Sequence, residues 1–475
     1  MKDKNIPFWL ITIGFMIALT LPKLIQDGMF LDAMLYTSVS HNLSMGIGTF
    51  WFPQFSSTYH NAGLSSFHEH PPLVFAIQSL FFKVFGNSMY VERFYTFLTM
   101  CLTAFLINVL WKEIFKNDSN LKKTGWLPVF LWITIPVCFW SYSNNMQENT
   151  MGIFTLSSVI LIYKSLQSQK KDIIKLFIAG LLIFLATMSK GIPGFFPLAV
   201  PLLYWIFTKK ASFSKALLRT LAIIAVPVIA YLILFSIPES RESLTFYLFK
   251  RVFGRIIQDP TVGSRFFILY RLLMELLPQI ILTFIIIGIS KLRKIKVMLP
   301  GQLAHSALFI CIGLSASVPL MLTLVQKGFY FVPALPYFAL GLSVLIAPAI
   351  SDWVEKISIK TVKFKIFLTL SILLLICVSG YSFSQKGKIA RDRDMLYDVY
   401  SIGKVVPAFT EVTVPTEMFS EYVLGCYFIR YFNISLKPEE KDEFYMIRKT
   451  MSTDSLSEYK KVRIDTKIYD LYKRK

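Results

Sequence analysis

The sequence predicts an α-helical polytopic membrane protein with a small α/β domain at its C-terminal end. Composition gives the first indication, because 54% of the 475 residues are hydrophobic and only 17% are charged, whereas an ordinary soluble domain carries about 25% charged residues. Apolar runs give the second. They recur along the chain at roughly the 20 residues that a helix needs to cross a hydrocarbon layer about 30 Å thick.

Eleven apolar segments are the expected membrane spans. They are residues 8–26, 90–111, 126–143, 149–166, 173–189, 192–208, 216–237, 266–288, 303–325, 329–349 and 366–384. A further segment, 71–86, is short, opens with two prolines and contains Lys83. We expect it to lie along the membrane surface. The first span follows a short basic stretch without a convincing small-residue cleavage site, which favours an uncleaved helix.

The distribution of positive charge predicts the orientation. The net charge is +21, and lysines and arginines form short clusters between the apolar runs. If the N-terminus is cytoplasmic and 71–86 does not cross, every short basic loop falls inside, as the positive-inside rule requires. If 71–86 crossed, all of them would fall outside. The charge is therefore interpreted as a sign of topology rather than of nucleic-acid binding.

This topology places the loop 27–89 and the tail 385–475 on the outer side. Residues 1–384 are then the transmembrane domain, and the more polar tail is predicted to be a small soluble α/β domain. Alternation over 461–472 predicts a strand, and 395–404 and 417–431 are predicted helices. The five cysteines show neither a disulfide framework nor zinc-ligand spacing.

Polar residues gather on the same predicted outer face. The loop 27–89 holds four of the five histidines together with Asp27, Asp32 and Glu69, and the outer turns add Glu148, Lys190 and Lys327. The two lysines depart from the positive-inside pattern, and each precedes a glycine. They are interpreted as an anion site, the alternative being side chains that merely snorkel to the interface.

Several motifs in order resemble the GT-C glycosyltransferases, within that class the aminoarabinose transferases and protein O-mannosyltransferases. The residues that carry the resemblance are Asp32–Tyr36 with Ser40–Leu43 and Gly46–Gly48, then Glu69–Leu73, Arg93, Thr187–Gly191, and Lys327 with Tyr330–Pro336. Together they cover roughly residues 8–350. Two positions differ from the family pattern: Ala33 stands where a paired acid is usual, and His70 replaces a lysine common in aminoarabinose transferases.

The resemblance implies an enzyme that transfers a sugar, with inversion, from a polyprenyl-phosphate donor to a lipid, glycan or protein acceptor on the periplasmic face of a bacterial inner membrane. Asp32 is the candidate general base, a role worth typically 10²–10⁴-fold, and Glu69 is the alternative acid. The candidate donor-phosphate ligands are His70, Lys190, Lys327, Tyr330, Arg255 and Arg265. The candidate sugar or acceptor contacts are Tyr36, Tyr59, Glu148 and Arg93.

Other interpretations stay open from the sequence. His68 and His70 are a candidate pair for a divalent metal, although two histidines in a loop are more often ordinary polar residues. No other cofactor is expected. A lipid flippase or transporter is the main alternative function, and it would carry ionisable residues deep inside several spans, whereas in this sequence they lie at span ends. A non-catalytic, lipid-dependent assembly factor is the second alternative, kept open by Ala33.

Overall fold

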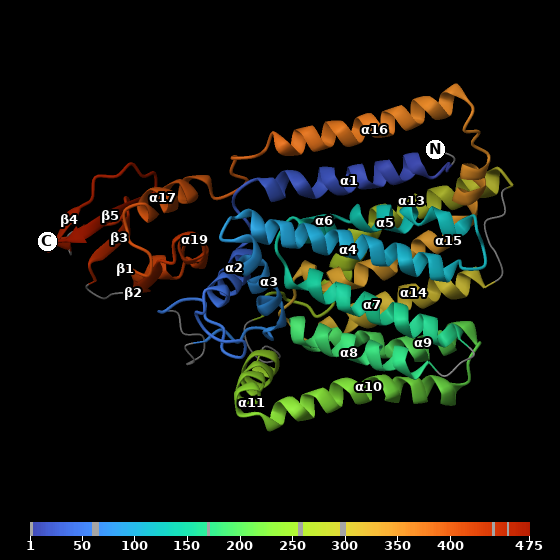
Figure 1. Cartoon of the computed structure of the whole chain (residues 1–475), viewed down its shortest axis with the longest axis horizontal. Helices are drawn as coiled ribbons and strands as arrows, with labels where there is room; N and C mark the ends of the chain where they lie inside the picture. The colour runs from blue at the N-terminus through green and yellow to red at the C-terminus, as the bar shows by residue number, and fades with distance from the viewer. Residues whose placement is uncertain are drawn as a thin grey trace. The chain divides into compact units, whose positions relative to one another are not determined.

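The structure is a computed structural model that describes residues 3–58, 66–168, 172–254, 260–294, 301–438, 442–453 and 456–475. Its chain divides into two compact units. Unit 1 comprises residues 1–22, 96–143 and 147–384, and unit 2 comprises residues 23–95, 144–146 and 385–475. Figure 1 shows the elements of both.

Unit 1 is built from long apolar helices that lie alongside one another (Figure 1). Its helices are α1 (Ile6–Ile25), α4 (Tyr90–Ile114), α5 (Trp126–Ile133), α6 (Pro136–Tyr142), α7 (Gln147–Gln167), α8 (Ile173–Lys190), α9 (Val200–Thr208), α10 (Phe213–Ser236), α11 (Pro238–Thr245), α13 (Phe267–Leu292), α14 (Gln302–Ser317), α15 (Leu335–Glu355) and α16 (Val362–Phe383). The first turns of α4 and the last residues of α1 belong to unit 2.

Shorter turns complete unit 1. The 3-10 helices are η1 (Leu121–Thr124), η2 (Ile192–Ala199), η4 (Val318–Leu322) and η5 (Gly328–Ala334), and η3 (Phe246–Phe253) is a π-helix. Proline explains one of the sharpest breaks. Pro136 begins α6 and cannot continue a helix from α5, and the axes of the two helical segments differ by 87°.

Among the described residues, eight helices are long and apolar enough to cross a membrane, or nine if the bent α5–α6 pair is one span. Two of the eleven predicted spans fall outside that set. One is α7, whose first turn is polar, and the other is the short apolar stretch Ile192–Thr208. The multi-pass helical class is confirmed, and the number eleven stays a prediction.

Unit 2 combines the first loop with the C-terminal segment. From the loop come α2 (Leu31–Ser44) and α3 (Leu73–Phe85). At about 1.5 Å per residue, the 13 residues of α3 are too short to cross a membrane, in line with the expectation for 71–86. The C-terminal helices are α17 (Arg393–Gly403), α18 (Thr416–Phe419) and α19 (Tyr422–Phe432).

A five-stranded sheet completes unit 2, with strand order β2-β1-β3-β5-β4. The strands are β1 (Glu411–Val414), β2 (Ser435–Pro438), β3 (Phe444–Arg448), β4 (Tyr459–Lys461) and β5 (Tyr469–Arg474). β1 pairs in parallel with β2 and β3, whereas β5 is antiparallel to β3 and β4. The predicted small sheet domain is thus confirmed. The predicted strand 461–472 is in fact the end of β4, a connection and most of β5.

Candidate functional site

Helix α2 of unit 2 presents the predicted base. Asp32 lies in the first turn of α2, where the positive end of the helix dipole stabilises a carboxylate. Tyr36 follows four residues later and therefore shares a face of the helix with Asp32. The Tyr36 hydroxyl oxygen lies 2.9 Å from His70 Nε2. Tyr36 and His70 are buried, whereas Asp32 and Glu69 are partly exposed.

The face of α2 that contains Ser38 packs against α19. The Ser38 hydroxyl donates a hydrogen bond to the carbonyl oxygen of Cys426 over 3.2 Å. Burial, and then the negative charge of Asp32, raise the pKa of the Cys426 thiol. The thiol therefore stays protonated, and a protonated thiol is a poor nucleophile.

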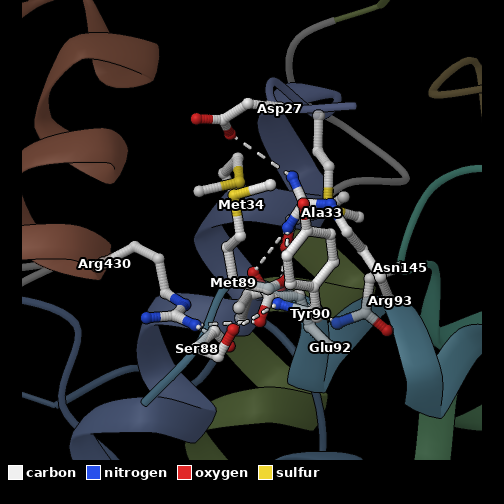
Figure 2. Close-up of polar contacts among 12 residues, drawn as sticks. Asp27, Ala33, Met34, Ser88, Met89, Tyr90, Glu92, Arg93, Asn145 and Arg430 are labelled. Carbon is white, nitrogen blue, oxygen red and sulfur yellow. Dashed lines mark hydrogen bonds and ion pairs between the residues drawn. The ribbon is translucent and has the colours of Figure 1, made fainter. Parts of the chain in front are cut away.

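Arg93 belongs to a buried ionic network at the start of α4, which Figure 2 shows. Its guanidinium lies 3.4 Å from Asp27 Oδ1 and 3.0 Å from Glu92 Oε1. Arg430 of α19 pairs with the second carboxylate oxygen of Glu92, with 2.9 Å between Arg430 Nη2 and Glu92 Oε2. We call Asp27, Glu92, Arg93 and Arg430 the buried ionic network. The contact of Arg93 with sugar or acceptor stays a prediction, and its guanidinium already binds two carboxylates of the protein.

Asp27 is held by further donors within unit 2. The hydroxyls of Tyr400 and Tyr431 each donate to its carboxylate over 2.6 Å, and so does the backbone N–H of Gly28. Burial raises the pKa of both tyrosines, so their protons remain available for these bonds. The Asp27 carboxylate is therefore fully engaged in holding the structure together.

Ala33 is fully buried, and Figure 2 labels it together with the buried ionic network. A second acid at this position would lie inside unit 2. Glu69 is the nearest substitute along the family pattern, and it is partly exposed.

The two loop histidines differ in their contacts. His68 Nε2 lies 2.7 Å from the Ser66 hydroxyl oxygen, and burial lowers the pKa of His68 to about 4. Within the described part of the chain, no group of three or more His, Cys, Asp or Glu side chains is placed to hold a metal ion. Tyr59 and His60 lie outside the described residues.

In unit 1, Glu148 and Lys190 form a buried ion pair. Lys190 Nζ lies 3.3 Å from Glu148 Oε1, and the two side chains are 7% and 1% exposed. Glu148 is in the first turn of α7 and Lys190 is the last residue of α8, so each charge faces the favourable end of its own helix dipole. The sequence placed both residues at one boundary but did not predict that they pair.

The backbone conformation after Lys190 requires a glycine at position 191. Its φ is +88° and its ψ is −150°, a region essentially restricted to glycine. A Cβ atom there would lie 1.7 Å from the Tyr247 hydroxyl oxygen. The chain can therefore turn sharply behind Lys190 only with glycine in that position.

Gln326, a buried glutamine that sequence reasoning missed, precedes Lys327 and contacts Arg265. Gln326 is 2% exposed, and its side-chain amide donates to the carbonyl oxygen of Arg265 over 2.9 Å. Arg265 Nη1 in turn donates to the carbonyl oxygen of Leu322 over 2.8 Å. Lys327 and Arg265 are both exposed. Tyr330, one turn beyond Lys327 in η5, is partly buried, and Arg255 lies outside the described residues.

A second cation accompanies Lys327. A Cβ atom at Gly328 would lie 3.5 Å from Arg271 Nε, so Arg271 borders this turn. Its Nη2 lies 2.6 Å from Glu275 Oε1, and Glu275 Oε2 accepts the backbone N–H of Val137 at the start of α6 over 2.7 Å. An arginine followed four residues later by a glutamate is a recognisable helix pair, but only the structure shows that it borders Gly328.

Comparisons with known proteins agree with this architecture. The family described as dolichyl-phosphate-mannose-protein mannosyltransferase matches residues 69–235. ArnT from Cupriavidus metallidurans bound to undecaprenyl phosphate has a similar structure, with 12% identity, a TM-score of 0.62, and coverage of 97% of this chain and 96% of that one. Its apo state gives a TM-score of 0.60 at the same identity and coverage.

The oligosaccharyltransferase of Archaeoglobus fulgidus in its apo form is also similar, at 16% identity and a TM-score of 0.51. The match covers 87% of this chain and 59% of that one. No curated protein sequence matches this chain significantly. The predicted GT-C fold is thus confirmed, and the family match together with the shared fold indicates a membrane glycosyltransferase of the GT-C class.

Proposed function

We propose that the chain transfers a sugar from a polyprenyl-phosphate donor to a lipid, glycan or protein acceptor on the periplasmic face of a bacterial inner membrane. One observation carries the proposal above the others. Asp32 stands partly exposed on the same helix face as Tyr36, whose hydroxyl meets His70. The similarity to an ArnT structure that contains undecaprenyl phosphate supports a donor of that chemical class.

In the proposed reaction, Asp32 takes the proton of the acceptor hydroxyl while that oxygen attacks the anomeric carbon. The bond to the phosphate oxygen breaks, polyprenyl phosphate leaves, and the configuration inverts. Because the leaving group gains negative charge, cations near it lower the barrier. Lys190, Lys327, Arg255 and Arg265 are proposed for that role, with His70 and Tyr330 as hydrogen-bond partners of the phosphate.

The test compares carboxylates in the purified full chain with radiolabelled polyprenyl-phosphate sugars. Asp32→Asn should lower transfer by about 10²–10⁴-fold without changing the thermal unfolding midpoint. Asp394→Asn is the matched control, because Asp394 is also a first-turn acid, on α17, and is exposed. It should retain full transfer.

Two outcomes would redirect the proposal. Full transfer by Asp32→Asn with loss in Glu69→Gln would move the base to Glu69. No transfer by the unmodified chain with any such donor, combined with donor binding, would favour the non-catalytic assembly factor. Analysis of the product's anomeric configuration by NMR checks inversion separately.

A further inference from the structure

A cavity of about 660 Å³ opens in unit 1 among the ends of α4, α7, α8, α9, α10 and α14. In Figure 1 this is the end of the bundle where α10 begins. Glu148 and Lys190 lie at the opposite ends of α7 and α8. Gln167 follows Glu148 by 19 positions, which correspond to about 28 Å of helix, close to the thickness of a membrane's hydrocarbon layer. The cavity is therefore separate from the candidate site residues of unit 1.

The lining of the cavity is cationic. Lys210, Lys215 and Arg219 line it, and none of these three has an ion-pair partner among the described residues. The acid in the lining, Asp172, is already paired with Lys175 at 2.8 Å. An excess of positive charge therefore faces this cavity, and an anion entering it would gain charge-assisted hydrogen bonds.

The same cavity also has an apolar edge. Ile173 and Leu218 line it and are 69% and 65% exposed, a position suited to contact with hydrocarbon chains. Deeper in the lining, Ser165 is 1% exposed, and its hydroxyl has no hydrogen-bond partner among the described residues. A buried hydroxyl without a partner costs free energy, which a bound polar group would recover.

We propose that this cavity binds the phosphate headgroup of an anionic phospholipid, with the acyl chains lying against Ile173 and Leu218. A volume of this size suits a headgroup with part of its glycerol, and basic pockets between membrane helices on the cytoplasmic side commonly bind such lipids. The predicted topology puts this end of the bundle on that side. The site is distinct from the donor site, which the proposed function places at the outer face.

Binding is tested with the detergent-purified full chain and three probes: dioctanoyl phosphatidylglycerol, dioctanoyl phosphatidylcholine and inorganic phosphate. Native mass spectrometry with titration gives the Kd of each. The phosphatidylglycerol should bind most tightly, and its affinity should fall as salt is raised. The triple variant Lys210→Gln, Lys215→Gln, Arg219→Gln should weaken phosphatidylglycerol binding by about one hundred-fold.

The matched control removes three other exposed lysines from the same predicted membrane side, as Lys360→Gln, Lys363→Gln and Lys365→Gln. It should leave the Kd within about two-fold of the unmodified chain, because it changes net charge equally without touching the cavity. Ala211→Trp, which fills the lining and keeps every cation, should also weaken binding. If the triple variant fails to fold, the Ala211→Trp variant still tests whether the lipid binds in this cavity.

Three results would overturn the proposal. Equal weakening in both triple variants would show diffuse surface attraction rather than a site. Unchanged affinity in Ala211→Trp would place the lipid elsewhere. Inorganic phosphate that binds as tightly as the phosphatidylglycerol would show a site for a free anion, without a role for the apolar edge.

Discussion

The two units of this chain accommodate charge in opposite ways. Unit 2 buries four charged side chains in one connected network, with Glu92 between Arg93 and Arg430 and with Asp27 beyond Arg93. Unit 1 turns large apolar side chains outward, as at Leu232 of α10, which is 67% exposed. Its buried pair, Glu148 with Lys190, lies at helix ends.

The contrast follows from the solvent that each unit meets. An apolar surface costs nothing against lipid, so unit 1 can leave its hydrophobic side chains outside. Its buried Glu148–Lys190 pair lies at helix ends, where the dipoles stabilise both charges. Unit 2 carries the polar loop and the tail. Buried ions there cost desolvation free energy that only close partners offset. Unit 2 should therefore be sensitive to the loss of single charges, and unit 1 to changes in close helix contacts.

The largest expected effect on stability is in the buried ionic network. Glu92→Gln removes the carboxylate between two buried guanidinium groups, so we expect a loss of about 3–5 kcal/mol in the free energy of unfolding. The measurement is the thermal unfolding midpoint of the full chain in detergent. Glu421→Gln is the control, because Glu421 pairs with the half-exposed Arg448 at the surface and should cost under about 1 kcal/mol. Equal shifts would show that burial does not distinguish these pairs.

The next effect tests close packing in unit 1. Gly191→Ala forces a Cβ into the Tyr247 hydroxyl and into a backbone region that costs an ordinary residue about 1–3 kcal/mol. Gly86→Ala in unit 2 is matched, with φ +80° and ψ −162° at the end of α3 but no atom within 4 Å of the added Cβ. Unfolding midpoints should fall in both and fall further in Gly191→Ala. A larger fall in Gly86→Ala would contradict the steric argument.

Variants of Lys190 and Lys327, the two lysines predicted to lie on the outer side, distinguish a structural role from a role in transfer. Lys327→Met should lower transfer by roughly ten- to hundred-fold with little change in stability, because Lys327 is exposed. Lys190→Met should lower both, since it leaves the Glu148 carboxylate buried without its cation. Adding Glu148→Gln to Lys190→Met should restore the unfolding midpoint but not transfer. Recovery of transfer in that double variant would assign Lys190 a purely structural role.

The smallest effect concerns pH and unit 2. The pKa of His68 falls from 6.5 to about 4 on burial, so the folded state favours the neutral ring. Its contribution to stability is complete above pH 6.5 and is lost as the pH falls toward 4. We expect about 1 kcal/mol of loss at pH 5.5. The unfolding midpoint of His68→Gln, measured from pH 7.5 to 5, should fall less steeply than that of the unmodified chain, and parallel curves would refute the assignment.

Much of the fold was predictable from composition and periodicity. Runs of apolar residues specify membrane helices because the backbone in lipid must satisfy its own hydrogen bonds, and local signals such as Pro136 and Gly191 set breaks between helices. Asp32, Tyr36 and His70 were predicted from their motif order, and the Tyr36–His70 contact shows two of them together. The count of eleven spans was less secure, because α7 begins with Gln147, Glu148 and Asn149.

The sequence by itself determined a multi-pass helical membrane protein with a small C-terminal sheet, and its motif order resembles that of the GT-C glycosyltransferases, because composition, helix length and motif order are local properties of the chain. Only the tertiary structure decided that Arg430, 338 positions from Glu92, neutralises it, that Gln326 joins Arg265 to the turn before Lys327, and that Lys210, Lys215 and Arg219 line one cavity. The first two are contacts between residues distant in sequence, and the cavity brings the start of α10 together with residues of α4, α7, α8, α9 and α14. They depend on how helices pack, and side-chain packing carries no period that a linear pattern could reveal.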